Sequence, residues 1–198
     1  MLILGKSAHR LSIDIDLICP PGTNIEDYLK SFADFGFINL ELVERKQRDD
    51  ADIPKSHSKF FYQIAYRNDT DAQSYILLDV LYEDIHYFQT RQIAIDCPFI
   101  RLEGEPLMVT VPSAEDILGD KLTAFAPNTT GIPYYKNGRS CSMEIAKQLY
   151  DVGRLFENVS DLQITKEAFR KIAVVELSYR SFGTDTVSYT HLRAHETR

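Results

Sequence analysis

The chain has 198 residues, of which 29 are Asp or Glu and 22 are Lys or Arg, giving a formal net charge of −7. This acidity argues mildly against a protein that binds nucleic acid through its overall charge, and it leaves open an enzyme that grips RNA through a local basic patch. The three cysteines are scattered, form no C-x-x-C motif and indicate reduced thiols. Neither a signal-peptide pattern nor an apolar run of membrane-spanning length is found. We therefore expect a cytoplasmic protein without membrane contact.

Short strands dominate the chain up to Pro112. Alternating apolar residues predict strands over residues 12–19, 37–43, 59–66, 74–81 and 107–111. The third and fourth of these are expected to form an antiparallel pair, because a turn-rich stretch joins them. A helix with Thr23 or Asn24 as its N-cap is predicted between the first two strands, up to about Phe35. Its apolar face comprises Tyr28, Leu29, Phe32 and Phe35.

Helical periodicity takes over after Pro112. Ser113 is expected to cap a helix that runs to about Phe125 and has acidic residues in its first turn. A loop is predicted over residues 128–140, and helices follow over residues 142–156 and 166–177. These elements predict an α/β (α+β) fold, with an N-terminal core over residues 1–112 and a helical region over residues 113–186.

The last twelve residues, 187–198, resemble the translation of a sequencing-library adapter. We expect this segment to be an artefact and leave it out of the fold prediction. In the remaining sequence no two histidines have the spacing of a zinc site, so zinc chemistry has little support.

Asp14 and Asp16 alternate with branched apolar residues in the first predicted strand. Strand geometry sends the two carboxylates to one face and the apolar residues to the other. Asp is depleted in strands, and two neighbouring anions repel unless a cation lies between them. The pair is thus a candidate divalent-metal clamp for phosphoryl chemistry, with a solvated strand face as the open alternative. The same D-x-D spacing at residues 50–52 and 69–71 falls in polar stretches that read as loops.

Three further residues are candidates for chemistry. Asp79 interrupts an apolar strand, and it would complete a three-carboxylate site if that strand lay beside the first one; otherwise it is a solvent-facing residue at a strand end. Lys121 lies on the first helix after Pro112 and is either a point cation for a triphosphate or a solvated lysine. Asp151 lies one turn from Lys147, and a surface pair between the two is the simpler interpretation.

Three segments resemble the AbiEii/AbiGii nucleotidyltransferase toxins in order and spacing. Residues 5–17 (GKSAHRLSIDIDL) resemble the R-x-S-x-D-[IVL]-D core of that family. Residues 116–124 (DILGDKLTA) are similar to its D-x-x-x-x-K-x-x-A helix, and residues 147–151 (KQLYD) match its R-D-x-x-D helix in part. The resemblance spans about residues 2–157. It implies a polymerase-β-like mixed sheet followed by a helical part, and a toxin of a type IV toxin–antitoxin system whose antitoxin is encoded alongside.

The resemblance also implies a reaction and its metal ions. Some members of the family transfer nucleotides from NTPs to tRNA, so the expected activity is transfer of an NMP from an NTP to an acceptor, with tRNA as the expected acceptor. Asp14, Asp16 and Asp79 would hold two Mg²⁺ ions. Asp79 would also orient or deprotonate the attacking hydroxyl.

A nucleotide-binding set follows from the same resemblance. Arg10 and Lys121 would balance the charge of the triphosphate, and Ser12 would either bind a phosphate or fix the strand edge. Asp151 would position Lys121 or the substrate.

The chain departs from the family pattern in three places. The family has a G-G-[ST] segment shortly before the first motif, but here only Met1–Leu4 precede Gly5, so Met1 is expected to be an internal methionine of a longer gene product. Lys147 and Gln148 stand at the R-D positions, and the predicted loop before them is longer than the usual link. A small-molecule nucleotidyltransferase of the aminoglycoside type, an inactive nucleotidyltransferase-fold binding module and a partner protein with an acidic surface therefore remain alternatives.

Overall fold

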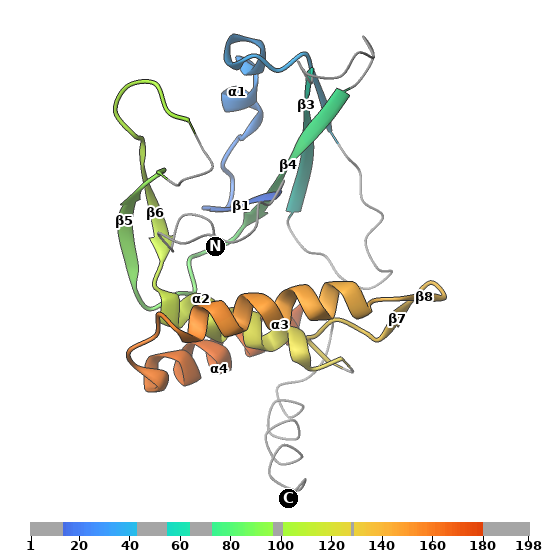
Figure 1. Cartoon of the computed structure of the whole chain (residues 1–198), viewed down its shortest axis with the longest axis vertical. Coiled ribbons are helices and arrows are strands. Elements are labelled where there is room, and N and C mark those ends of the chain that lie inside the picture. The colour runs from blue at the N-terminus through green and yellow to red at the C-terminus, as the bar shows by residue number, and fades with distance from the viewer. Residues whose placement is uncertain (1–13, 43–54, 64–72, 97–100, 128, 180–198) are drawn as a thin grey trace, which may run out of the picture. The chain divides into compact units, whose positions relative to one another are not determined.

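The computed structural model describes residues 14–42, 55–63, 73–96, 101–127 and 129–179 (Figure 1). These residues fall into two compact units, one before residue 86 and the other from residue 86 onward, which we call the sheet unit and the helical unit. Helices and a mixed sheet together confirm the predicted α+β class. The expected functional division at residue 112 stays a prediction. The adapter-like tail lies outside the described residues.

The sheet unit contains a mixed four-stranded sheet in its described residues. Its strands are β1 (Asp14–Cys19), β2 (Asn39–Leu42), β3 (Lys55–Gln63) and β4 (Gln73–Tyr82). In the order β1-β4-β3-β2, β1 runs parallel to β4 and the other neighbours are antiparallel, which confirms the predicted antiparallel pair. One face of the sheet carries the apolar core, in which Phe60, Leu78 and Val80 pack with Leu29.

The helix predicted over residues 23–35 is wrong in its length and in part of its apolar face. Two short pieces replace it, α1 (Glu26–Leu29) and the 3₁₀ helix η1 (Phe32–Phe35). The break between them ends the 3.6-residue period, so Phe32 still packs in the same core as Leu29, whereas Phe35 is 77% exposed. Leu29 is buried in the core, whereas Tyr28 is 74% exposed.

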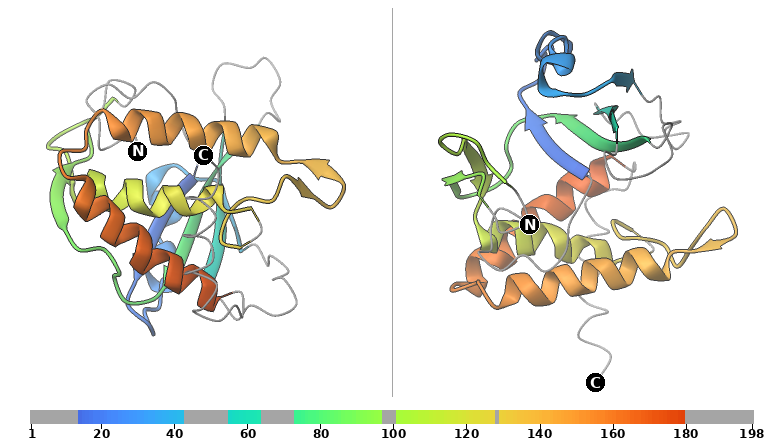
Figure 2. Two further views of the ribbon diagram at one scale, coloured as in Figure 1. Left: turned by 90° about the horizontal axis from the view of Figure 1, so that it is seen from below. Right: turned by 45° about the horizontal axis from the view of Figure 1, so that its top comes forward.

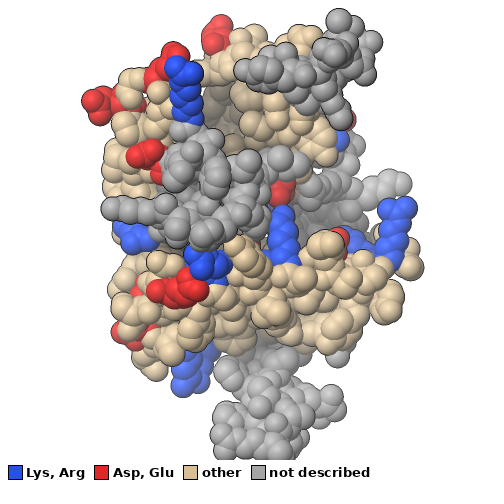
Figure 3. Space-filling model, viewed as in Figure 1, with Lys and Arg blue, Asp and Glu red and all other residues tan. Residues whose placement is uncertain are grey.

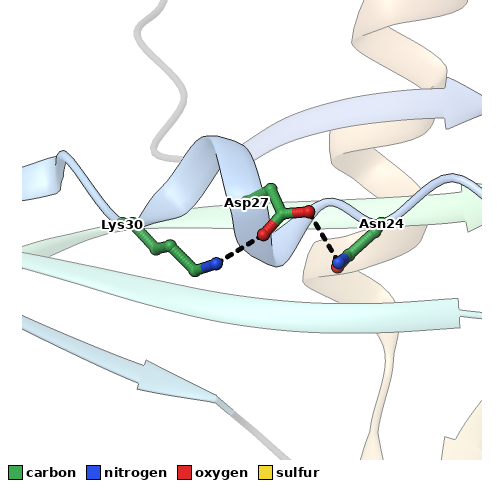
Figure 4. A network of polar contacts seen from close by, with 3 residues as sticks. All are labelled: Asn24, Asp27 and Lys30. Atoms are coloured by element: carbon green, nitrogen blue, oxygen red, sulfur yellow. Dashed lines mark hydrogen bonds and ion pairs between the residues drawn. The ribbon is translucent and has the colours of Figure 1, made fainter.

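Local polar contacts explain why neither predicted N-cap is used. The Thr23 hydroxyl donates to the carbonyl oxygen of Pro20 at 2.7 Å and so closes the turn before the helix. The side-chain amide of Asn24 donates to Asp27, whose carboxylate also pairs with Lys30 (Figure 4). Both side chains are therefore occupied elsewhere and do not reach the open N–H groups of the first helical turn.

The helical unit contains three long helices and two strand pairs in its described part. Its elements are β5 (Thr90–Ala94), β6 (Met108–Pro112), α2 (Ala114–Leu122), the 3₁₀ helix η2 (Thr123–Phe125), β7 (Tyr135–Lys136), β8 (Arg139–Ser140), α3 (Ser142–Phe156) and α4 (Leu162–Ser178). Helix α2 lies between α3 and α4 (Figure 2). Its fully buried Leu118 packs with Leu155 of α3 in the core of this unit.

The helices of this unit agree with the sequence pattern better than its strands do. Ser113 caps α2 by accepting the N–H of Asp116 at 3.1 Å, and α3 has the predicted bounds. Helix α4 begins four residues before the predicted residue 166, because Asp161 caps it there. The apolar pattern does not predict β5, whose first three residues are exposed. The loop predicted over residues 128–140 is wrong in part, because an Asn-Gly turn folds it into the β7–β8 hairpin.

The connection between α3 and α4 is tied back to the start of α2. The Glu115 carboxylate accepts the backbone N–H of Ser160 at 2.9 Å and its hydroxyl at 3.0 Å. The backbone hydrogen bond holds the pKa of Glu115 below its ordinary value, because it stabilises the charged form of the carboxyl.

Gly119 sets how closely α2 and α4 approach each other. A Cβ atom at this position would lie 2.7 Å from the Ala168 Cβ and 2.7 Å from backbone atoms of Thr165 and Phe169. Backbone atoms cannot move aside without shifting the whole helix, so a side chain at this crossing forces the two helices apart. Gly153 on α3 differs, because a Cβ there would meet nothing within 4 Å.

We expect Gly119→Ala to lower the free energy of unfolding by about 1–3 kcal/mol, because α2 and α4 must separate to admit the methyl group. Gly153→Ala is the matched control, and it should raise the free energy of unfolding by about 0.5–1 kcal/mol through reduced backbone entropy of the unfolded chain. Urea unfolding of both variants measures the difference. A similar effect at the two positions would contradict the close packing at Gly119.

Candidate functional site

The pairing of β1 with β4 brings the predicted carboxylates to one face of the sheet. The register sets Asp16 opposite Asp79 and Asp14 opposite Leu77. Residues two apart along a strand share a face, and so do residues directly opposite each other on neighbouring strands. The three aspartates therefore lie on the same face, while the intervening residues such as Leu78 form the apolar core on the other. The sequence places Asp79 with Asp14 and Asp16 only if its strand lies beside theirs, and β4 does lie beside β1.

His57 is a member of this site that the sequence pattern does not reveal. It lies opposite Asp79 where β3 pairs with β4, and its Nδ1 is 2.7 Å from the Asp79 Oδ1. The His57 side chain is 14% exposed and that of Asp79 27%, so the contact is shielded from bulk water but the carboxylate stays reachable. The apolar alternation predicts β3 only from residue 59, which leaves His57 outside the expected strand. Its partner is fixed by the pairing of strands distant in sequence.

The three aspartates have the ligand chemistry of a magnesium site and share one face of the sheet. Mg²⁺ takes carboxylate oxygens as ligands, and two adjacent strands supply them here on one face. Asp16 is exposed and Asp14 half-buried, which leaves this part of the sheet open to a bound substrate. In the described part of the chain, no three His, Cys, Asp or Glu side chains are gathered closely enough to form a ready-made metal cluster.

Lys121 and Asp151 meet in the helical unit. The Lys121 Nζ, in the last turn of α2, lies 3.3 Å from the Asp151 Oδ2 on α3 and donates to the Gln148 Oε1 at 3.1 Å. Asp151 is 1% exposed, whereas the Lys121 side chain is 22% exposed. A carboxylate so deeply buried needs a cation or several donors, and Lys121 supplies the cation. The Lys121 side chain is thereby held in place while it stays partly accessible.

Asp116, the first residue of the second motif, has a structural role. It is fully buried and accepts the backbone N–H groups of Phe88 and Gln89, both at 2.9 Å, and the hydroxyl of Ser113 at 2.8 Å. These bonds tie the segment before β5 to the start of α2. The aspartate of this motif therefore orders the backbone around the helix that carries Lys121.

Two predicted nucleotide-binding residues, Arg10 and Ser12, lie outside the described residues. The remaining candidates fall into two groups. Asp14, Asp16 and Asp79 belong to the sheet unit, and Lys121 and Asp151 belong to the helical unit.

The family of the chain follows from a comparison of its whole sequence with protein-family models. Residues 1–197 match the nucleotidyl transferase AbiEii toxins of type IV toxin–antitoxin systems. The chain belongs to the AbiEii family. This membership confirms the resemblance carried by the three motifs and, with it, the general function of a nucleotidyl transferase toxin. A comparison with curated proteins gave no match.

AbiEii membership implies an NTP substrate, usually together with divalent metal ions, and a cognate antitoxin. Among the helices that the structure describes, none combines the length and the apolar character needed to cross a membrane.

Gln148 marks where this AbiEii chain departs from the R-D-x-x-D helix pattern. Its side-chain oxygen accepts a hydrogen bond from Lys121, so a neutral amide takes up a contact that a carboxylate could have made. Lys147, at the arginine position, is exposed on the same helix. The contact between Lys121 and Asp151 is kept despite both changes.

We expect a strong energetic coupling between Lys121 and Asp151. Lys121→Met should lower the free energy of unfolding by roughly 2 kcal/mol or more, because it removes the Lys121 cation from the buried Asp151 carboxylate. Adding Asp151→Leu should restore much of that loss, since the buried carboxylate is then gone. Urea unfolding of the two single variants and the double variant gives the coupling energy, expected to exceed about 1 kcal/mol.

The more exposed pair of Arg154 on α3 and Glu157 at its C-cap, 2.7 Å apart, is the matched control. A double-mutant cycle there should give a coupling of less than about 1 kcal/mol, because water screens both charges. Additive losses at Lys121 and Asp151 would contradict the buried pair.

Proposed function

We propose that this AbiEii protein transfers a nucleoside monophosphate from an NTP to tRNA and acts as the toxin of a type IV toxin–antitoxin pair. The observation that carries the proposal is the β1–β4 register, in which Asp16 lies opposite Asp79 and Asp14 shares their face. Nucleotidyl transfer develops negative charge on the attacking and leaving oxygens, which divalent metal ions stabilise. Carboxylate oxygens are the ligands that hold such ions. The tRNA acceptor is supported by the resemblance to family members that modify tRNA.

In the proposed reaction, a hydroxyl oxygen of the acceptor attacks the α-phosphorus of the NTP in line. A new phosphorus–oxygen bond forms, the bond to the bridging oxygen of the β-phosphate breaks, and pyrophosphate leaves. Asp79 orients the hydroxyl and accepts its proton. Asp14, Asp16 and Asp79 would hold magnesium ions, which when bound supply charge neutralisation for the attacking and leaving oxygens.

His57 is proposed as the positioning residue for Asp79. The contact of 2.7 Å between the imidazole and the carboxylate restricts the rotation of the Asp79 side chain. Carboxylates that bind metal ions are commonly held by such a second contact, and its loss weakens metal binding. His57 itself is not expected to touch the nucleotide.

Lys121 is proposed to balance phosphate charge together with Arg10, and Ser12 is proposed to donate a hydrogen bond to a phosphate. Lysine acts on phosphates as a compact point charge. The support comes from within the helical unit, where Asp151 and Gln148 hold the ammonium group of a partly exposed side chain. Asp151 then positions Lys121 and needs no contact with the substrate.

We expect Asp16→Asn to abolish the transfer of nucleotide while leaving the fold intact, because Asp16 is exposed and opposes another carboxylate. The protein is incubated with Mg²⁺, each α-labelled NTP in turn and total tRNA, and label on tRNA is measured. Asp34→Asn is the control, since Asp34 is also an exposed aspartate of the sheet unit. Urea unfolding of both variants verifies their stability.

Each other outcome of this experiment replaces one part of the proposal. Undiminished transfer by the Asp16→Asn protein would remove the carboxylate site. Label on a small hydroxyl compound in place of tRNA would make the protein a small-molecule nucleotidyltransferase. Magnesium-dependent NTP binding without transfer to any acceptor would favour the inactive binding module.

We expect His57→Ala to weaken the binding of divalent metal by about 10- to 100-fold, because Asp79 loses the contact that orients it. Binding of Mn²⁺ followed by electron paramagnetic resonance measures this affinity without turnover. The rate constant kcat should fall, with little change in KM for the NTP. His86→Ala, in the helical unit, is the matched control, and an unchanged Mn²⁺ affinity of the His57→Ala protein would reduce His57 to a packing role.

A further inference from the structure

The β7–β8 hairpin reverses the charge of an otherwise acidic chain. No Asp or Glu occurs between Asp120 and Glu144, although these two residue types make up 29 of the 198 positions. Residues 134–140 are all exposed. They include two aromatic rings and two cations, namely Tyr134, Tyr135, Lys136 and Arg139. Figure 3 shows basic side chains at this end of the helical unit.

The hairpin holds its two cations side by side. Asn137 and Gly138 form a two-residue turn in which both have positive φ, 52° and 75°, and Lys136 pairs directly with Arg139 across it. Directly opposite residues share a face, with Cβ atoms roughly 5 Å apart, and like charges in such a pair destabilise a hairpin. An anion that contacts both side chains removes this repulsion. A negatively charged ligand at the tip of the hairpin would therefore be stabilised by both cations.

The two tyrosines add flat apolar surface that the fold does not use. Tyr134 is 65% exposed and Tyr135 72% exposed. In both Figure 1 and Figure 2, the hairpin extends from the N-terminal end of α3 away from the other helices of its unit. Nucleobases stack on exposed aromatic rings, and cations beside such rings contact the phosphates of the same strand. An acidic protein surface would match the cations alone and give no use to the rings.

The chain just before the hairpin is fixed to η2 and its C-cap residue. The N–H of Gly131 donates to the carbonyl of Ala126 at 2.7 Å, and that of Ile132 donates to the carbonyl of Ala124 at 2.9 Å. A Cβ on Gly131 would lie only 2.5 Å from the Ala124 oxygen, so the chain passes here in close contact. A firmly anchored hairpin presents its side chains in a set arrangement, which reduces the entropy lost on binding.

We propose that the β7–β8 hairpin binds single-stranded RNA, with Lys136 and Arg139 on adjacent phosphates and Tyr134 and Tyr135 stacked on bases. This inference deepens the proposed function in one respect, since it takes the bound RNA to be the acceptor of the nucleotide. RNA binding by the hairpin itself requires neither NTP nor metal, and it is therefore measured separately from transfer.

The test uses the full chain and a short fluorescent single-stranded RNA of mixed sequence, with binding followed by anisotropy at several salt concentrations. The double variant Lys136→Ala with Arg139→Ala should weaken binding and lower the salt dependence, the slope of log K against log salt, by about 1.4 for two lost phosphate contacts. The control double variant, Lys166→Ala with Arg170→Ala, removes the same charge from exposed positions of α4 and should change the slope little.

The rings are tested by a second matched pair. Tyr135→Ala should weaken RNA binding about tenfold, whereas Tyr28→Ala, which removes a ring of nearly equal exposure from α1, should have little effect. Equal binding by the hairpin variants and the unsubstituted chain would overturn the proposal and direct the search to a protein partner for the hairpin. Equal losses in the hairpin and control variants would also overturn it, because general charge would then explain binding.

Nucleotide transfer to tRNA, measured on the same proteins, keeps the two proposals distinguishable. Hairpin-dependent RNA binding without any transfer supports the hairpin and overturns the catalytic proposal. Transfer to tRNA that is unchanged in the hairpin variants, together with unchanged RNA binding, overturns the hairpin alone. All variants are first compared by circular dichroism, and exposed positions such as these should leave the unfolding transition unchanged.

Discussion

The pairing of β1 with β4 in a single register is the constraint on which the candidate site depends. Asp16 directly opposite Asp79 is unfavourable, because like charges in a cross-strand pair cost about 0.2–1 kcal/mol. A shift of β4 by one residue relative to its neighbours would separate the two charges. It would also turn the β4 side chains Leu78 and Val80 out of the core. Burying each of those side chains is worth about 1.5–3 kcal/mol. Hydrophobic burial therefore outweighs the repulsion and fixes three carboxylates on one face, where a divalent cation would relieve it.

Buried charge orders the helical unit in a different way. Asp116 and Asp151 are both almost fully buried on facing parts of the fold, yet their partners differ. Asp116 is satisfied by backbone N–H groups and a hydroxyl, which makes it a fixed structural element. Asp151 is paired with the ammonium of Lys121, whose side chain remains partly exposed. Burial of this carboxylate thus sets the position of the cation that we propose to balance phosphate charge.

Most local features of this fold follow from the sequence, whereas those set by distant pairing do not. Alternation predicts the strands of the sheet, and the Ser113 cap and the bounds of α3 follow from residues close in sequence. The α1 region is wrongly predicted because Thr23 and Asn24 make turn contacts in place of caps. His57 could not be selected, since its relation to Asp79 depends on the β3–β4 register. The loop predicted over residues 128–140 misses the β7–β8 hairpin, although the Asn-Gly turn there is a local hairpin signal.

Two cross-strand pairs in the described strands join residues of like charge, one pair anionic and the other cationic. Asp16 faces Asp79 in the sheet unit, and Lys136 faces Arg139 in the helical unit. A fold selected for stability alone would replace one member of each pair, because surface substitutions that remove repulsion are easily found. A metal cation would stabilise the anionic pair. A nucleic-acid strand would stabilise the cationic pair through its phosphates and stack its bases on the exposed rings beside it. The proposed transfer of a nucleotide onto RNA would use both, and this one proposal therefore offers a reason for two separate unfavourable contacts.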